Sequence, residues 1–279
     1  MFIAVAVVLY CSCEKPVTDI QSNEKTKKFT FEVKGDFGAP SFTRGYLQAD
    51  GQDMTDLWVF DYVGGVCVQS VHQTSEDEAW GKPTLALTYG SHHVYFVASR
   101  GEGATLNEDG HTITWTGPRD TFWKDYAVDV VSGSNGNRSV TLDRVSTKLK
   151  IIITDEVPSD CKRIIVTPGE WYYGWNYVDG VVMAQQHTER IVNIPTSYVG
   201  TSGDLAISIF GLSGKTEWTT DVNIEAQGDN NSVIGSATIT DAPFMSNRST
   251  EYSGPIFGST GTVDVGLSTE WQDAYQASW

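Results

Sequence analysis

The sequence predicts an all-β protein built from two β-sandwich domains. Apolar and polar residues alternate with a period of two through most of the chain beyond Phe29. Turn-forming residues recur about every 8–12 residues, a spacing typical of β-sandwiches. No window shows a sustained period of 3.6 residues together with helix caps. The length of 279 residues fits two such sandwiches.

The first half of the chain contains a regular succession of predicted strands. The earliest holds Phe29, Phe31 and Val33, separated by polar residues. Gly64 and Gly65 mark a turn between the next two strands and therefore predict a hairpin. The stretch 94–97 is continuously apolar, as expected of a strand buried on both faces. The strands after the first are predicted at 57–62, 66–71, 85–87, 94–97, 128–130, 140–142 and 149–153.

The stretch 137–157 is the longest without Gly or Pro and is the most plausible place for a helix. It is rich in Val, Thr and Ile, and Lys148 and Lys150 are spaced by two, so strands are favoured there too. Asp155 and Glu156 precede Pro158, which is expected to end the last strand of the first domain. We therefore predict an N-terminal domain at 29–154 and a C-terminal domain at 155–279.

The second half repeats the same strand pattern. Antiparallel sheets of this kind leave edge strands to which another chain can add a strand. The predicted strands lie at 164–166, 181–183, 191–194, 205–210, 222–224, 233–239 and 263–265.

Composition and charge exclude a wholly disordered chain and a nucleic-acid-binding protein. Hydrophobic residues make up 40% of the chain, enough for a core. Lys and Arg number 19 against 35 Asp and Glu, a net charge of −16. A chain this acidic is repelled by phosphate backbones, so we expect no nucleic-acid partner.

The segment 1–13 is predicted to be a lipoprotein signal peptide. The apolar run Phe2–Leu9 is much shorter than the roughly 20 residues that span a bilayer, and it fits the core of a secretory signal. Ser12 followed by Cys13 resembles a lipobox, which makes Cys13 the expected lipid-attachment residue. An ordinary secretory signal and a trimmed membrane stub are the alternatives. The polar segment 14–28 is predicted to be a flexible tether with a reach of about 20 Å.

The sequence contains no catalytic or cofactor motif, so we predict neither enzymatic activity nor a cofactor. G-x-S-x-G, H-E-x-x-H and P-loop patterns are all missing. His92 and His93 are adjacent in a predicted strand and should point to opposite faces, which disfavours a shared metal.

Three aspartates precede the strand at 57–62. Asp50, Asp53 and Asp56 could offer oxygen ligands to Ca²⁺, but they lack the spacing of an EF-hand, so a solvated acidic loop and no metal are favoured. Cys67 and Cys161 fall in different predicted domains and are expected to be free, buried thiols.

An aromatic cluster is the most unusual local feature of the sequence. It comprises Trp171, Tyr172, Tyr173, Trp175 and Tyr177. Rings exposed together could stack on sugars or contact a partner. The alternative, which we favour, is that they fill the core of the second sandwich or an interface between the domains.

Short motifs in a fixed order carry a resemblance to a known family. The chain resembles the fimbrillin-type proteins of Gram-negative anaerobes of gut and mouth, and most closely the fimbrillin-A associated anchor family. The matching segments are 12–15 (SCEK), 42–45 (FTRG) ahead of the strand ending at 59–61, 121–123 (TFW), 140–145 (VTLDRV), 148–149, 154–158, 247–250, 254–257 and 271–273 (WQD).

The resemblance implies two transthyretin-like Greek-key β-sandwiches and a lipid-anchored subunit of surface fimbriae in the outer membrane. Palmitate would be carried on Cys13. The implied partners are other fimbrial subunits joined by strand exchange, the outer membrane, and surface glycans or proteins of host or bacteria that support adhesion. Anchor, stalk and tip roles stay open. The alternative function is a surface glycan-binding lipoprotein that uses the aromatic cluster at 171–177.

In such fimbrial systems an Arg-specific protease removes the N-terminal strand of stalk subunits, whereas anchor subunits stay intact. By this resemblance Arg44 and Gly45 form a candidate cleavage site. The stretch 35–51 is punctuated by Gly and Pro and is therefore expected to be an exposed, cuttable loop. Cleavage there would detach Phe29–Val33 and expose an apolar groove, which a strand from a neighbouring subunit could fill.

Overall fold

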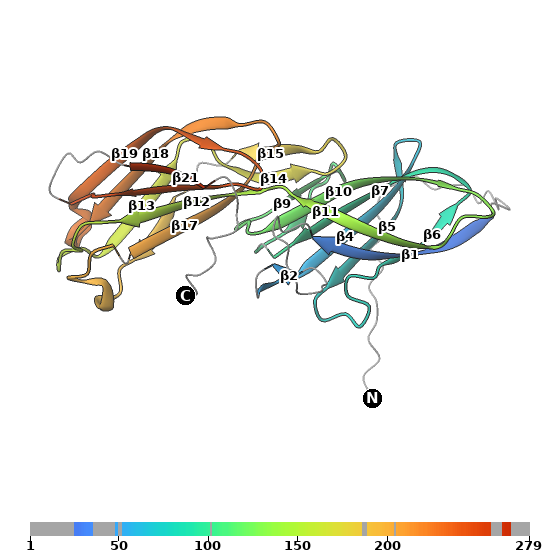
Figure 1. The fold of residues 1–279 in the computed structure, drawn as a ribbon, viewed down its shortest axis with the longest axis horizontal. Helices are drawn as coiled ribbons and strands as arrows, with labels where there is room; N and C mark the ends of the chain where they lie inside the picture. The colour runs from blue at the N-terminus through green and yellow to red at the C-terminus, as the bar shows by residue number, and fades with distance from the viewer. Residues whose placement is uncertain are drawn as a thin grey trace. The chain divides into compact units, whose positions relative to one another are not determined.

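The computed structural model describes residues 25–35, 48–49, 52–100, 102–185, 189–203, 205–257 and 264–268 (Figure 1). Most of these residues lie in strands, and their helical segments are two single 3₁₀ turns, η1 (Thr196–Tyr198) and η2 (Asp229–Asn231). The prediction of an all-β fold is confirmed. The described residues divide into two compact units. The first unit takes residues up to Trp115 together with Arg119–Arg144 and Asn176–Gly180, and the second takes the others.

Seven strands form the body of the first unit. They follow one another in the order β5-β4-β7-β10-β11-β1-β6. The strands are β1 (Thr26–Gly35), β4 (Asp56–Val63), β5 (Val66–Thr74), β6 (Thr84–Thr88), β7 (Gly90–Ser99), β10 (Thr121–Val130) and β11 (Asn137–Arg144). Two short pairs accompany them, β2 (Gln48–Ala49) with β3 (Gln52–Asp53) and β8 (Thr105–Leu106) with β9 (Thr112–Thr114).

This set of strands folds over into two layers. Strands β10 and β11 pair at two positions only, Phe122 with Arg144 and Trp123 with Asp143, so the two layers diverge beyond that point. At the other margin the Ala86 amide donates to the side-chain oxygen of Gln69, at 3.1 Å, which joins β6 to β5. The core between the layers is formed by Phe29, Phe31, Val33, Met54, Leu57, Val59, Leu85, Leu87, Val94, Phe96, Ala98, Phe122, Val130, Val140 and Leu142.

Strands β4 and β7 are buried on both faces. Leu57 and Val59 point into the core, so Trp58, Phe60 and Tyr62 point the opposite way, yet all of them are buried. The prediction that 94–97 is buried on both faces is confirmed, since all four side chains are buried.

A turn from later in the chain, Asn176–Gly180, covers the second face. The ring of Tyr177 stacks on Phe60 with centroids 4.2 Å apart. The Tyr177 amide donates to the His111 carbonyl at 3.0 Å, and the Trp123 indole donates to the Tyr177 carbonyl at 2.8 Å. Because of these contacts, the aromatic side chains of β4 are shielded from water.

The second unit is a sandwich of two four-stranded sheets. One has the order β17-β12-β20-β21 and the other β16-β13-β18-β19. Leu149, Ile151 and Ile153 of the first sheet share one core with Ile164 and Val166 of the second. The strands are β12 (Ser146–Ile153), β13 (Arg163–Pro168), β16 (Arg190–Asn193), β17 (Leu205–Leu212), β18 (Trp218–Gln227), β19 (Val233–Phe244), β20 (Ser249–Gly254) and β21 (Asp264–Ser268), with β14 (Tyr172–Asn176) beside β15 (Val181–Gln185).

Two boundaries differ from those expected. The division falls between Arg144 and Val145 instead of at 154–155, because β12 pairs along its whole length with β17 and also with β20 of the second unit. The segment 26–28, expected in the tether, belongs to β1 because its backbone pairs with 86–88 of β6. Backbone pairing requires no apolar side chain, so polar residues can extend a strand.

A buried ion pair links β11 to the segment before β10. Arg144 Nε lies 2.7 Å from Asp120 Oδ1, and both side chains are fully inaccessible. We predict that Asp120→Ala destabilises the protein by about 3–5 kcal/mol in urea unfolding, because it leaves a buried guanidinium without its counter-charge. The exposed pair Arg119–Glu102 is the control, and Glu102→Ala should change stability by less than about 1 kcal/mol. Equal effects would contradict the prediction.

Candidate strand-exchange site

Strand β1 is held on both edges by hydrogen bonds. It runs parallel to β11 over Thr30–Gly35 and antiparallel to β6 over Thr26–Thr30. Beyond β6 the second edge of β1 runs beside a loop. There the Phe31 amide donates to the Pro83 carbonyl and the Val33 amide to the Gly81 carbonyl, each at 3.0 Å. The strand therefore lies in a backbone-lined groove with few amides left for water.

The inward face of β1 fills this groove with apolar side chains. Phe29, Phe31 and Val33 are completely buried. Phe31 meets Phe96 and Tyr126 edge to face, with centroid distances of 5.2 and 5.9 Å. The guanidinium of Arg138 lies 5.2 Å from the centroid of the Phe29 ring, a cation–π geometry.

The burial of these side chains is large relative to the stability of a domain. Each fully buried Phe or Val contributes about 1.5–3 kcal/mol, so the three together contribute roughly 5–8 kcal/mol. A typical domain is stable by only about 5–15 kcal/mol. The first unit therefore needs β1, or an equivalent strand, in this groove.

Gly136 allows the chain to pass close to β1. A Cβ on Gly136 would lie 2.4 Å from the carbonyl oxygen of Lys28, a distance that real Cβ atoms do not adopt. The Gly136 carbonyl accepts from the Thr30 amide at 2.7 Å. No local pattern in the sequence predicts this contact between Gly136 and β1.

A buried His–Asp pair fixes the groove wall formed by β6. His92 Nδ1 of β7 lies 2.7 Å from Asp61 Oδ1 of β4, and His92 Nε2 lies 2.9 Å from the carbonyl oxygen of Thr88 at the end of β6. Burial raises the pKa of the Asp61 carboxyl, and the hydrogen bond and charge of His92 offset this only in part. This link spans the core from β4 and β7 to β6.

Two parts of the predicted site cannot be placed. Cys13 and the segment with Arg44 and Gly45 lie outside the described residues. Lipid attachment and cleavage therefore remain predictions.

The aromatic cluster does not form an exposed platform. Trp171, Tyr173, Trp175 and Tyr177 are buried, and only Tyr172 is partly exposed. Trp171 packs edge to face on Phe244 at 4.9 Å, and its indole donates to the Phe210 carbonyl at 2.9 Å. Trp171 and Tyr173 belong to the core of the second unit, as the favoured alternative predicted.

The histidine prediction is confirmed in its geometry. His92 faces inward to Asp61, while His93 faces outward and lies 3.0 Å from Asp125. Within the described part of the chain, no group of three or more His, Cys, Asp or Glu residues is arranged to hold a metal.

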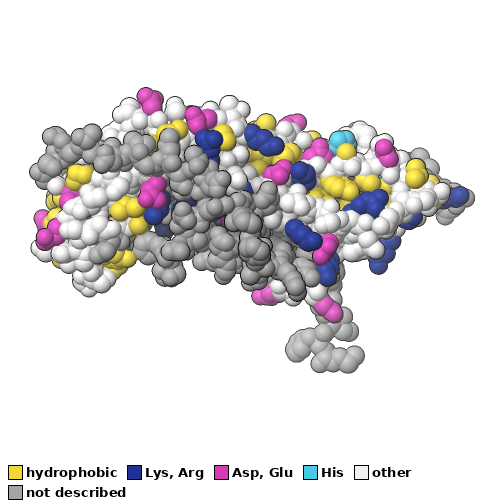
Figure 2. Space-filling model, viewed as in Figure 1, with side chains coloured by type: hydrophobic (Ala, Val, Ile, Leu, Met, Phe, Trp, Pro, Cys, Tyr) yellow, Lys and Arg dark blue, Asp and Glu magenta, His cyan; other side chains and the backbone are white. Residues whose placement is uncertain are grey.

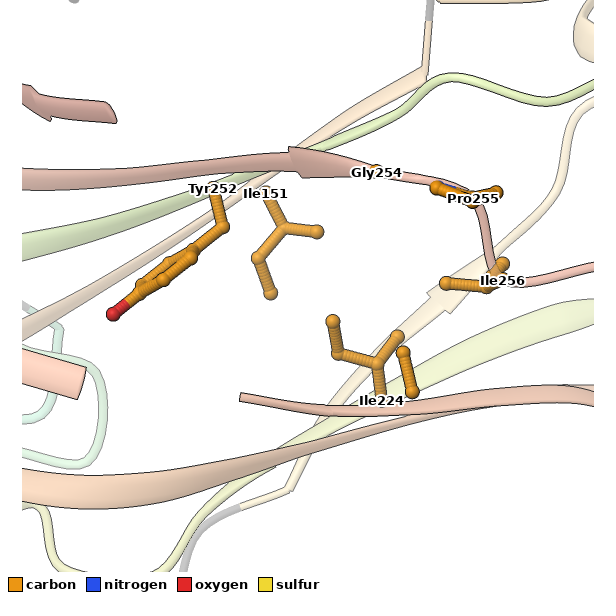
Figure 3. A pocket seen from close by; sticks show the side chains of 7 residues that line it. Ile151, Ile224, Tyr252, Gly254, Pro255 and Ile256 are labelled. Carbon is orange, nitrogen blue, oxygen red and sulfur yellow. The ribbon is translucent and has the colours of Figure 1, made fainter. Parts of the chain in front are cut away.

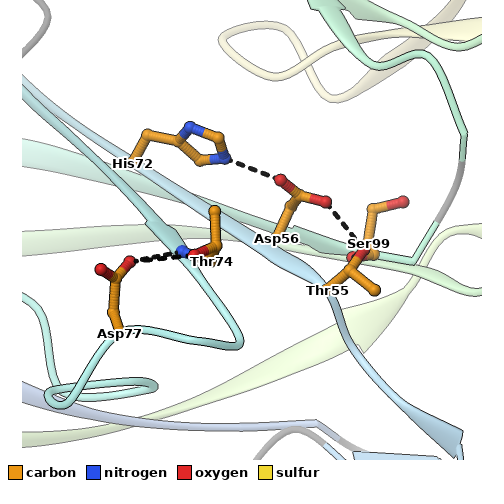
Figure 4. A network of polar contacts seen from close by, with 6 residues as sticks. All are labelled: Thr55, Asp56, His72, Thr74, Asp77 and Ser99. Carbon is orange, nitrogen blue, oxygen red and sulfur yellow. Dashed lines mark hydrogen bonds and ion pairs between the residues drawn. The ribbon is translucent and has the colours of Figure 1, made fainter. Parts of the chain in front are cut away.

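Asp56, the last of the three aspartates in the predicted acidic loop, is engaged with protein groups (Figure 4). Its carboxylate lies 2.8 Å from His72 Nε2 and accepts from the Thr55 hydroxyl at 2.7 Å. The His72 ring also stacks on Trp58 at 4.8 Å. Neither Cys67 nor Cys161 forms a disulfide within the described part of the chain. Only Cys161 is buried, and burial raises the pKa of its thiol.

The second unit contains a small apolar pocket (Figure 3). Seven residues line it, namely Ile151, Ile224, Ala237, Tyr252, Gly254, Pro255 and Ile256. Beside it, the Asp155 carboxylate accepts from the amides of Ile256 and Phe257 at 3.0 and 2.5 Å. None of the seven lining residues carries a charge.

This chain is similar to known proteins in its structure. No family model matches the chain, and no curated protein sequence matches it. A fimbrial assembly protein from Parabacteroides distasonis is 11% identical with a TM-score of 0.51, and the match covers 88% of this chain and 100% of that one. The fimbrial anchor protein Mfa2 from Porphyromonas gingivalis is 8% identical with a TM-score of 0.52, covering 87% and 99%.

A candidate adhesin from Bacteroides ovatus is 12% identical with a TM-score of 0.54, covering 88% of this chain and 95% of that one. The chain has the fold of these proteins. At the level of fold, the resemblance to fimbrillin-type proteins is confirmed. In the described part of the chain, no helix is both long and apolar enough to span a membrane.

Truncating Phe31 tests the contribution of β1. We predict that Phe31→Ala lowers the free energy of unfolding by about 3–5 kcal/mol, because it leaves a cavity between Phe96 and Tyr126. Lys28→Ala, on the exposed face of the same strand, should change it by less than about 0.5 kcal/mol. Urea unfolding of both variants measures the difference, and a loss for Phe31→Ala no larger than that for Lys28→Ala would refute it.

The Asp61 carboxyl predicts a dependence of stability on pH. Because its pKa is raised in the folded protein, folding is favoured where Asp61 is protonated in both states. As pH rises above about 4, the Asp61 carboxyl ionises first in the unfolded protein. The wild type therefore loses stability relative to Asp61→Asn until the carboxyl also ionises in the folded protein. Urea unfolding of both proteins from acid to neutral pH measures this, and a constant difference would contradict it.

Proposed function

We propose that this protein is a lipid-anchored, non-enzymatic subunit of surface fimbriae, of anchor or accessory type. It is attached to the outer membrane through an acyl chain on Cys13 and joins other subunits by strand complementation. The burial of β1 in its groove is the observation on which this proposal rests. A strand near the start of the chain fills a groove closed on both edges and buries three apolar side chains there.

The arrangement supports a strand that is replaceable in principle. Its strand partners and the core that it fills lie within the first unit, and its side chains follow a simple alternation of apolar and polar residues. A segment with the same alternation could reproduce both the burial and the ladder hydrogen bonds. Cleavage at Arg44 would free β1 for such an exchange, and without cleavage the subunit keeps both β1 and its lipid. We place the protein with the intact anchors, because its late motifs resemble that family.

The fold of the neighbours adds support. Two of them are described as a fimbrial assembly protein and a fimbrial anchor protein. The alternative of glycan binding through the cluster at 171–177 is less favoured, because four of its five rings are buried.

Analysis of purified fimbriae tests the proposal. We expect this chain in the fimbrial and outer-membrane fraction, with an N-terminus at Cys13 and an acyl mass on that residue by mass spectrometry. Cys13→Ala should release the chain from the membrane fraction. An N-terminus at Gly45 would replace the anchor role by that of a stalk subunit, and absence from the fimbrial fraction would overturn the proposal.

A further inference from the structure

One end of the first unit collects chain segments that are distant in sequence. Thr26 at the start of β1 pairs with Thr88 at the end of β6, and Tyr89 leads directly into β7. Gly90 pairs with Val130, the last residue of β10. The β4–β5 hairpin also turns here, since Tyr62 pairs with His93 near the start of β7. We call this the β1-proximal end, formed by Lys25, Lys27, Lys28, Val66, Val68, Tyr89 and Val131.

Three lysines concentrate positive charge at this end. Lys25 and Lys28 are exposed, and Lys27 is partly buried, with its ammonium donating to the Ser132 carbonyl at 3.2 Å. The nearby carboxylate of Asp129 accepts from the Ser91 hydroxyl. Several of the Lys and Arg side chains visible in Figure 2 lie over the part of the molecule that holds β1. In a chain of net charge −16, this local excess of cations is unusual.

The same end carries most of the exposed large apolar side chains of the first unit. Val66 is 64% exposed, Val131 59%, Val68 56% and Tyr89 43%. In the described part of this unit, the other such residue is Leu106. The Tyr89 amide donates to the Lys25 carbonyl, and Val131 adjoins Ser132, which binds Lys27, so cations and apolar groups are interleaved. Lysine with tyrosine and aliphatic residues is the combination found at bilayer surfaces, where one part meets phosphate and the other meets acyl chains.

Chain length brings this end close to a bilayer. Lys25 stands only twelve positions after Cys13. Twelve residues span at most about 40 Å when fully extended and about 20 Å as a root-mean-square coil. If Cys13 carries lipid, the β1-proximal end is therefore the part of the described structure that the chain keeps nearest to the membrane.

We infer that the β1-proximal end docks on the anionic headgroups of a lipid surface. This rests on the proposed lipid anchor, for which it supplies a second attachment, because one acyl chain with a basic patch binds more firmly than either alone. The lysines attract lipid phosphates, while Tyr89 and the valines enter the headgroup layer. The contact also orients the acidic remainder of the protein away from the anionic surface.

Vesicle co-sedimentation tests this surface apart from the lipid. The mature chain, which begins at position 13 and carries Cys13→Ala, is mixed with phosphatidylcholine vesicles that contain about 30% phosphatidylglycerol, or none. We expect binding to the anionic vesicles only, weakened by salt. Lys25→Glu with Lys28→Glu should reduce the affinity at least about tenfold. Lys162→Glu with Lys215→Glu, exposed cations of the second unit with the same change in net charge, should leave it nearly unchanged.

A second pair of variants tests the apolar component. Tyr89→Ser with Val131→Ser should reduce binding several-fold, whereas Ile191→Ser with Val233→Ser, equally exposed in the second unit, should not. Unchanged thermal unfolding shows that each variant is folded. Equal binding by both lysine pairs, or binding to polyglutamate but not to anionic vesicles, would overturn the inference. Those results would leave the fimbrial proposal intact, because acylation of Cys13 is measured independently by mass spectrometry.

Discussion

The burial of β1 is the constraint on which the first unit depends. Its three inward side chains lie at the centre of the core, and its backbone completes the ladders of β11 and β6. Removing the strand would expose apolar surface and leave two strand edges unpaired, both of which cost free energy in water. The same physics makes the groove receptive to any extended segment with matching alternation. Stability and the proposed assembly role thus come from one contact.

Residues that could suggest catalysis are used to hold sheets together. His92 and Asp61 join β7 and β4 to β6, and Arg144 and Asp120 form a buried ion pair. These groups are paired with one another inside the units, where burial of an unpaired charge is costly. Such pairs account for buried charges without requiring a substrate, which agrees with a structural role.

Successive segments in the first part of the chain would have successive roles. Cys13 would provide the lipid, the lysines from 25 to 28 the contact with headgroups, and Phe29–Val33 the strand that fills the groove. An intact subunit keeps all three in covalent continuity, as an anchor requires. Cleavage at Arg44 would separate the rest of the first unit from both the lipid and the lysines, so cleavage of this one bond would decide between anchoring and polymerisation.

The sequence by itself determined the fold class, most strand positions and the opposite orientation of His92 and His93, because alternation along a strand is a local property. It did not reveal β20, whose sequence STEYSG has no apolar run. Nor did it reveal that β12 belongs to the second unit, which depends on the pairing of β12 with β17 and β20. The fate of the aromatic cluster was also decided by tertiary structure. Whether a ring is covered depends on segments far away in the chain, as when Tyr177 stacks on Phe60, and no local pattern encodes that contact.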